Sequence, residues 1–175
     1  MKRVVGALFA LGLILWGLGD LFAGFGSGLG LNTAAAASGK NHITWDVAID
    51  CRTWRFNSGL SFATFARGDG FIANGKIFPA GTLQSGVQNN DPNDPGSIGN
   101  WVERGTMAAT LAEIMAGTRP AFFATWYHLL DDGRGLVADG PHPDTGPMAV
   151  TGGTGTFRGA GGELDAEILG TNITG

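Results

Sequence analysis

The sequence predicts an all-β domain built from short antiparallel strands, and two observations predict it. From Ile43 to Cys51, apolar residues alternate with mostly polar ones, which is the period of a strand with one face in a core. The chain of 175 residues also holds 31 glycines and 7 prolines without a strict period, which indicates many turns between short strands. With 43% hydrophobic residues, the chain has enough apolar material for a barrel or a sandwich.

The first 37 residues are predicted to be a secretory signal. Two basic residues precede an apolar run that ends at Gly19, and small residues offer a cleavage site near Ala36 or Ala37. The apolar run is about 16 residues long, short of the roughly 20 that span a bilayer. We therefore expect a secreted or periplasmic protein, a single β-barrel domain at 38–175 and no stable membrane span after cleavage. An uncleaved N-terminal anchor is the alternative.

Turn residues between apolar runs predict two hairpins. Asn74 and Gly75 separate two short apolar runs, and a type I′ turn needs the positive φ that both residue types tolerate. The residues from Asp131 to Gly135 turn the chain back after Ala121 to Leu130, a strand that is apolar on both faces. A strand of this kind packs on something at its outer face as well.

The remaining elements are assigned from composition. Gln84 to Asn100 is dense in turn residues and is predicted to be a loop, without the spacing of a calcium-binding EF-hand. Trp101 to Met107 is predicted to be a strand. Ala108 to Ala116 has the composition of a short helix, and a strand is the alternative there. Leu164 to Leu169 alternates as a short last strand.

A glycine-rich stretch from Met148 to Gly162 admits two interpretations. In one, an apolar strand enters a glycine turn that opens a helix and cradles a dinucleotide phosphate. Gly159, Gly161 and Gly162 argue against it, because each stands where that helix would begin and costs it about 1 kcal/mol relative to alanine. In the other, the glycines form a tight corner between two antiparallel strands, and this is the prediction.

The same stretch carries a resemblance to known families. The segment Met148 to Ala160, with its Gly-Gly-Thr-Gly corner followed by Phe157, resembles the signature of plant allene oxide cyclases and dirigent proteins. The resemblance covers Ala121 to Asn172 and implies an eight-stranded antiparallel barrel and assembly as a trimer. It also implies a cofactor-free activity. The first half of the mature chain does not match these families, whose catalytic residues lie largely there, so none is carried over.

Charge and composition exclude several classes of function. The formal net charge of −4 argues against binding to nucleic acid or anionic membranes. A single cysteine, Cys51, allows no intramolecular disulfide and is expected to be buried and inert; an intermolecular bridge is the alternative. We predict no metal and no cofactor, because no histidine lies in a metal-spacing motif. Asn172 begins a glycosylation sequon, which matters only in a eukaryotic secretory route.

Three strand residues with polar tips are the catalytic candidates: Tyr127, Glu103 and His128. Neighbouring residues of a strand point to opposite faces, so only one of Tyr127 and His128 can look into a barrel. We predict that Tyr127 faces inward, because its phenol can both pack and donate a hydrogen bond. Phe123 and Thr125 share its face and complete the predicted ligand-binding set. An outward, merely polar role is the alternative for each.

Two functions are compatible with these residues. The predicted one is a cofactor-free barrel that binds a small hydrophobic molecule and steers its cyclisation or coupling, an isomerase-type or dirigent-type activity implied by the resemblance. The alternative is a non-catalytic secreted binding or structural module. The interior discriminates between them: inward polar groups around a cavity favour the first, and solid aromatic packing favours the second.

Overall fold

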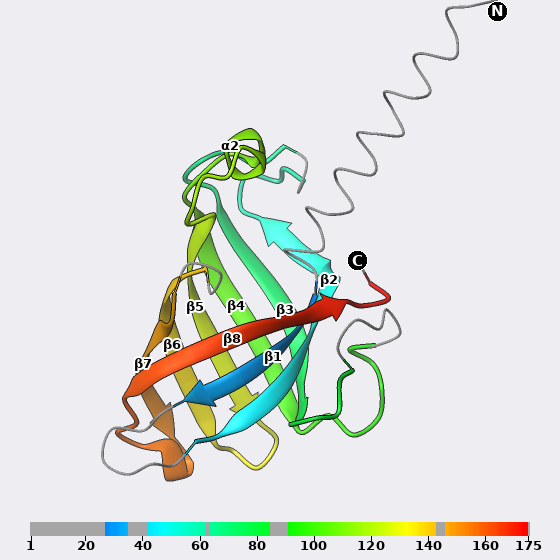
Figure 1. Ribbon diagram of the computed structural model, residues 1–175, viewed down its shortest axis with the longest axis vertical. Helices are drawn as coiled ribbons and strands as arrows, with labels where there is room; N and C mark the ends of the chain where they lie inside the picture. Colours follow the sequence, from blue (N-terminus) through cyan, green and yellow to red (C-terminus); the bar gives the residue numbers. More distant parts are fainter. Residues whose placement is uncertain (1–26, 35–41, 62–63, 85–90, 143–145, 175) are drawn as a thin grey trace, which may run out of the picture.

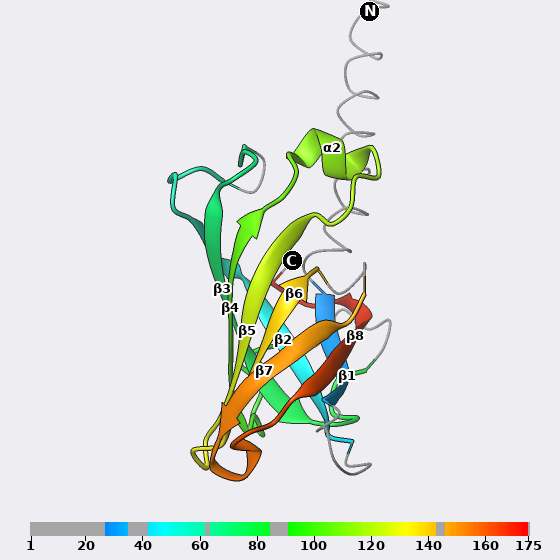
Figure 2. The same ribbon diagram turned by 90° about the vertical axis from the view of Figure 1, so that its left-hand side faces the viewer.

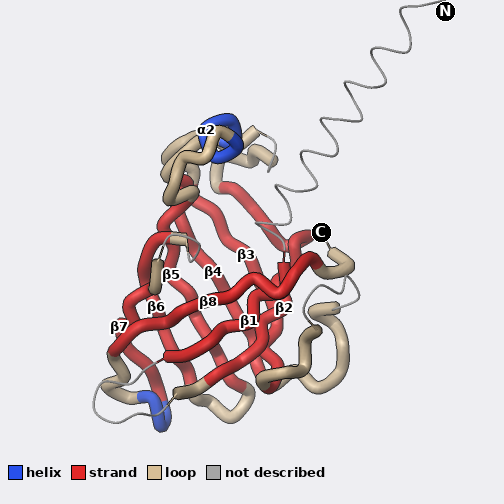
Figure 3. Tube along the Cα trace, viewed as in Figure 1, coloured by secondary structure: helices blue, strands red, loops and turns tan. Residues whose placement is uncertain are grey.

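A computed structural model describes residues 27–34, 42–61, 64–84, 91–142 and 146–174. Within them lie one α-helix, α2 (Leu111–Met115), and one 3-10 turn, η2 (Gly155–Phe157). All other regular structure is strand (Figures 1 and 3): β1 (Ser27–Ala34), β2 (Thr44–Phe56), β3 (Gly70–Pro79), β4 (Gly99–Met107), β5 (Phe122–Leu130), β6 (Gly135–Pro141), β7 (Met148–Thr154) and β8 (Gly162–Thr171). The prediction of a mostly antiparallel β domain with almost no helix is confirmed.

The strands from β2 to β8 form one antiparallel sheet in which each strand pairs with the next along the chain. The sheet curls strongly, so that its first and last strands approach each other (Figure 2). β1 lies in this seam and pairs with both of its edges, opposing Leu29 to Val47 of β2 and Gly30 to Glu167 of β8. A barrel-like shape results, with one enclosed face and one outer face.

The position of β1 bears on the predicted signal segment. β1 lies inside residues 1–37, whereas 1–26 and 35–37 lie outside the described residues. Cleavage near Ala36 or Ala37 stays a prediction, and it would take β1 away with the leader. Residues 38–175 alone then supply seven of the strands in this sheet. In the part of the chain that the structure describes, no helix is long and apolar enough to cross a membrane.

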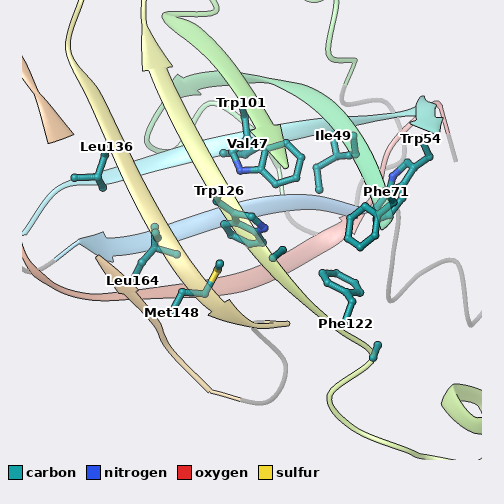
Figure 4. Packing of buried hydrophobic residues seen from close by; sticks show 14 of the residues in the cluster. Val47, Ile49, Trp54, Phe71, Trp101, Phe122, Trp126, Leu136, Met148 and Leu164 are labelled. Carbon is teal, nitrogen blue, oxygen red and sulfur yellow. The ribbon is translucent and has the colours of Figure 1, made fainter. Parts of the chain in front are cut away.

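The hydrophobic core fills the enclosed face of the sheet. It consists of inward side chains from alternate positions of the strands, as the period of a strand requires. Figure 4 shows its central members, which include Val47, Ile49, Trp101, Trp126, Leu136, Met148 and Leu164. Aromatic residues crowd the end near Trp54, where Phe71 stacks on Trp54 at 4.8 Å between ring centroids and meets Phe122 edge-on at 5.0 Å.

Helix α2 lies at one end of the sheet, beyond the start of β5 (Figure 1). Thr110 and Glu113 form a capping box in which each side chain satisfies the backbone N–H of the other. Glu113 also accepts a hydrogen bond from Arg67 at 2.6 Å, which ties the helix to the loop between β2 and β3. The predicted helix from Ala108 to Ala116 forms over the five residues Leu111–Met115.

The hairpin predicted at Asn74 and Gly75 is wrong, because both residues lie within the continuous strand β3. They pair with Asp50 and Ile49 of β2 on one side and with Val102 and Trp101 of β4 on the other. A Cβ atom on Gly75 would lie 2.5 Å from the carbonyl oxygen of Ala48. Glycine stands there to allow a close approach of two strands, not a turn. The second predicted hairpin, with its turn from Asp131, does join β5 to β6.

The glycine corner follows the second of its two interpretations. β7 runs into the three-residue turn η2 and returns as β8, with Val150 opposite Gly162. Gly155 has a φ of +61°, which glycine adopts without strain. A Cβ on Gly153 would lie 2.6 Å from the carbonyl oxygen of Gly135 and 2.7 Å from Phe157. No α-helix follows the corner, so the element that a dinucleotide site requires is not present among these described residues.

The asparagine of the glycosylation sequon is buried, and with Thr174 it forms a clasp at the end of the chain. Asn172 is only 4% exposed, and its side-chain N–H donates to the carbonyl oxygen of Ile49 at 2.6 Å. The side-chain oxygen of Asn172 accepts from the hydroxyl of Thr174, which in turn accepts from the backbone N–H of Cys51 at 3.0 Å. The atom that would carry a glycan is thus occupied in holding the C-terminal end against β2.

Candidate functional site

The enclosed face of β5 presents Trp126 and His128, and its outer face presents Tyr127. Trp126 is 1% exposed and His128 is fully buried, whereas Tyr127 is half-buried on the opposite side. The prediction that Tyr127 faces inward is therefore wrong. Both faces of β5 are rich in apolar residues, so the alternation alone did not show which face lies in the core. The indole of Trp126 buries more apolar area than a phenol, which favours this orientation.

Glu103 lies on the enclosed face of β4, directly opposite Trp126. It is 1% exposed, and its carboxyl oxygen accepts a hydrogen bond from the Trp126 indole N–H at 2.7 Å. Burial raises the pKa of Glu103 to about 8, although the hydrogen bond from Trp126 opposes the shift. At neutral pH the side chain is a carboxylic acid with a proton to donate.

His128 lies next to this acid, in a wall of aromatic rings. Its imidazole stacks on Trp45 at 5.6 Å and meets Trp126 edge-on at 6.3 Å between ring centroids. Neither ring nitrogen has a hydrogen-bond partner among the described residues. Burial lowers the pKa of His128 to about 4, and a backbone interaction with Leu136, outside hydrogen-bonding geometry, offsets only part of this. The imidazole is therefore neutral at physiological pH.

The register of β4 and β5 makes the acid and the imidazole neighbours. Glu103 faces Trp126 and Trp101 faces His128, so Glu103 and His128 are diagonal partners on one face of the sheet. Diagonal residues have Cα atoms about 7–8 Å apart, so long and aromatic side chains at such positions reach one another. The indole N–H of Trp101 is buried there without a hydrogen-bond partner among the described residues. Buried polar groups of this kind normally pair with water or with a ligand.

This arrangement offers proton transfer in a dry aromatic environment. A neutral carboxylic acid can donate a hydrogen bond or a proton to an oxygen of a bound molecule. A neutral imidazole can accept a proton on one nitrogen and donate one from the other. Aromatic faces stabilise positive charge that develops beside them. We refer to Glu103, His128 and the surrounding rings of Trp45, Trp101 and Trp126 as the interior site.

Of the predicted site residues, Glu103 and His128 meet in the interior site, and the others do not. Phe123, Thr125 and Tyr127 lie together on the outer face, where they line an open groove with a volume of about 820 Å³. The hydroxyl of Thr125 donates to the carboxylate of Asp139 on β6. Whether these residues bind a ligand stays a prediction, but they cannot share one with Glu103, because the sheet lies between them.

Trp45, Trp101 and Trp126 were not among the predicted site residues. A signal for two of them was present, since Trp126 shares a strand face with His128 and Trp101 shares one with Glu103. Trp45 lies on β2 and reaches His128 only through the curl of the sheet, which no local pattern reveals.

The described residues contain no group of three histidine, cysteine or acidic side chains placed to hold a metal ion. Cys51 is half-buried, and burial raises the pKa of its thiol, so the nucleophilic thiolate is disfavoured. Cys51 is thus less buried than predicted, and its inertness stays a prediction that the raised pKa supports.

No family model, no curated protein and no solved structure matches the chain. The resemblance to allene oxide cyclases and dirigent proteins therefore stays a prediction, as does the trimer that it implies. What the interior site does must be argued from its own geometry.

Proposed function

We propose that the protein binds a small hydrophobic molecule in the interior site and steers its cyclisation or coupling without a cofactor. The observation that carries this proposal is the fully buried His128, whose two nitrogens lack partners among the described residues, beside the protonated Glu103. A structural core has no need of two ionisable groups, and each costs free energy to bury. A ligand with an oxygen atom between them would satisfy both.

The proposed chemistry uses the neutral states of both groups. The carboxylic acid of Glu103 donates a hydrogen bond to an oxygen of the ligand as negative charge develops on it. The rings of Trp101 and Trp126, 5.3 Å apart at an angle of 74°, hold the carbon skeleton in a bent shape and exclude water. His128 accepts the proton that leaves the ligand when a new bond or double bond forms.

We also infer that β1 closes an eight-stranded barrel in the working protein. Its pairing with β2 and β8 supports this, because an open seam would expose two strand edges and admit water to the interior site. A chain that begins after Ala34 should therefore be less stable than one that keeps β1. Equal unfolding midpoints of the two chains would contradict the inference.

Binding is tested with a neutral apolar probe, N-phenylnaphthylamine, whose fluorescence rises in an apolar site. Energy transfer from the interior tryptophans reports that the probe lies beside them. We expect wild-type protein to bind the probe, and His128→Phe, which fills the site and removes both nitrogens, to lose most of the binding. Tyr127→Phe, on the outer face of the same strand, is the matched control and should bind as wild type does.

Catalysis is tested separately with Glu103→Gln, which keeps the shape of the side chain and an acceptor for the Trp126 indole. Turnover of an unsaturated epoxide by wild type but not by Glu103→Gln, with equal probe binding, would support the acid role.

The binding or structural module remains the second candidate, and one observation favours it. Trp45, Trp101, Trp126 and His128 already contact one another as ring pairs at 5.3–6.3 Å, which is the spacing of a packed aromatic core. Failure of the neutral probe to bind, together with unchanged stability in its presence, would leave this candidate standing.

A further inference from the structure

The outer groove lies on the face of the sheet opposite the interior site and is independent of the function proposed above. It crosses five strands, from β2 to β6, and opens to solvent. Its volume of about 820 Å³ is in the range of small-molecule sites. Its lining includes Arg55, Ile72, Arg104, Phe123, Tyr127 and Asp139.

The register of the sheet places the charged members of the groove in one row. Arg55 opposes Ile72, and Ile72 opposes Arg104. Arg104 in turn opposes Thr125, which opposes Asp139. Because neighbouring strands lie about 4.8 Å apart, the two arginines stand about 10 Å apart on either side of Ile72. The row therefore presents two cations separated by an apolar side chain.

The charges in this row are unevenly compensated. Asp139 accepts hydrogen bonds from the hydroxyls of Thr125 and Thr151, so its carboxylate is already engaged. The side chain of Arg104 is exposed, and its guanidinium makes no hydrogen bond or ion pair with any described residue. Arg55 is held in place by donating to the carbonyl oxygens of Arg52 and Trp54, both at 2.7 Å. Two arginines against one aspartate leave the groove locally positive on a chain whose net charge is −4.

Apolar surface flanks the free guanidinium group. Phe123 is 53% exposed and Ile72 is 38% exposed, which is high for large apolar side chains. Phe123 and Tyr127 lie two positions before and after Thr125, the residue opposite Arg104, so the register places an aromatic residue diagonally on each side of Arg104. The groove thus combines a planar cation that forms paired hydrogen bonds with apolar surfaces that a ring or short chain can cover.

We propose that the outer groove binds a small organic anion, an apolar or aromatic carboxylate. The carboxylate pairs with the Arg104 guanidinium, and the apolar body lies over Phe123 and Ile72. We infer an anion because the groove is locally positive. We infer that the anion has an apolar body, unlike a free inorganic ion, because apolar surface is exposed beside the guanidinium. The groove gives the chain a second binding site that differs from the interior site in both charge and exposure.

The test compares two probes that differ only in charge, naphthoate and the neutral naphthamide, by isothermal titration calorimetry of the full chain. We expect naphthoate to bind at millimolar concentration or below and naphthamide to bind at least about tenfold more weakly, since a charge-assisted pair is lost. Arg104→Gln should weaken naphthoate by a similar factor and leave naphthamide unchanged. Arg104→Lys, which keeps the charge but not the planar fork, should fall between.

Arg158→Gln is the matched control. Arg158 is exposed on the turn between β7 and β8, and the substitution removes the same charge as Arg104→Gln does. It should change naphthoate affinity by less than about twofold, as expected of a screened remote charge. Equal affinity for the two probes, no naphthoate binding at millimolar concentration, or equal losses in Arg104→Gln and Arg158→Gln would each overturn the proposal. Sedimentation velocity adds one further outcome: an oligomer that dissociates in Arg104→Gln would show that a second copy of the chain, not a small anion, occupies the groove.

Discussion

The two faces of β5 place opposite chemical environments on a single strand. On the enclosed face, Trp126 and His128 are buried, and the neighbouring Glu103 keeps its proton. On the outer face, Phe123 and Tyr127 lie partly in water beside the charged Arg104. Both faces carry aromatic residues, yet the acid on the enclosed face is buried and neutral, whereas the arginine on the outer face is exposed to solvent.

The difference teaches that burial, and not residue type, decides what an ionisable group can do here. Glu103 and Arg104 are adjacent in sequence, and one is 1% exposed while the other is exposed. The pKa of the buried carboxyl rises far above its ordinary value, whereas the Arg104 guanidinium lies in solvent, where an anion can reach it.

The largest expected effect is on stability. Trp126→Ala removes a fully buried ring and leaves the carboxyl of Glu103 without its indole donor, so we expect a loss of about 3–5 kcal/mol in the free energy of unfolding. Phe123→Ala, on the outer face of the same strand, should cost less than about 1 kcal/mol because its ring is half in water. Urea denaturation of the two variants checks both values. Similar losses would show that the two faces are not distinct.

The pH dependence of stability should follow from the two buried ionisable groups. Glu103 has a pKa of about 8 against an ordinary 4.5, and His128 a pKa of about 4 against 6.5. Between pH 4.5 and 6.5, the folded protein holds a proton on Glu103 that the unfolded chain has released, and it lacks one that the unfolded chain has taken up on His128. The two effects cancel there.

Between pH 6.5 and 8 only the proton on Glu103 differs, and the folded state binds it more tightly. The free energy of unfolding should therefore fall by about 2 kcal/mol as the pH rises across this window. Urea denaturation at both ends of the window measures the change. Glu103→Gln should abolish the decline, whereas Glu163→Gln, on an exposed residue, should keep it. A decline of equal size in Glu103→Gln would assign the proton to another group.

The clasp at Asn172 compares a buried polar residue with an exposed apolar one, because Asn172 is buried and its neighbour Ile173 is exposed. Asn172→Ala removes the shorter of the two hydrogen bonds that side chains donate to the carbonyl oxygen of Ile49, and we expect a loss of about 1–3 kcal/mol. Ile173→Ala should change stability by less than about 0.5 kcal/mol, since Ile173 is 57% exposed. Thermal unfolding of both variants tests the difference. A larger loss from Ile173→Ala would mean that the clasp does not hold the C-terminal end.

The smallest effect is expected from Tyr127→Phe. Removing the hydroxyl of a half-buried residue on the outer face should change the free energy of unfolding by less than about 0.5 kcal/mol. Binding of N-phenylnaphthylamine in the interior site should be unchanged. Fluorescence titration and urea denaturation check the two statements, and weaker binding of the neutral probe would place Tyr127 in the interior after all.

Local patterns in the sequence predicted most strands of the sheet. The alternation of apolar and polar residues predicted β2, and the turn residues after Leu130 predicted the hairpin between β5 and β6. The hairpin at Asn74 failed because Gly75 is required by a neighbouring strand. Its contact with Ala48 is a tertiary constraint that a local turn preference cannot reveal.

The interior site was predictable only in part. Glu103 and His128 were recognised as polar residues on apolar strands, but their proximity depends on the register of β4 and β5. The inward face of β5 could not be chosen from a segment with apolar residues on both sides. The role of Asn172 depends on Ile49, which lies 123 residues earlier in the chain. The row of groove residues likewise appears only when five strands are aligned.

The central claim is that the enclosed face holds Glu103 as a neutral acid, and carbon-13 NMR tests it most directly. Protein labelled at the glutamate side-chain carboxyl carbon is titrated, and the Glu103 signal is assigned as the one missing from Glu103→Gln. The account predicts that this signal titrates near pH 8, well above the exposed glutamates. A midpoint near 4.5 would show that the carboxyl is ionised at neutral pH, and it would contradict the proposed acid.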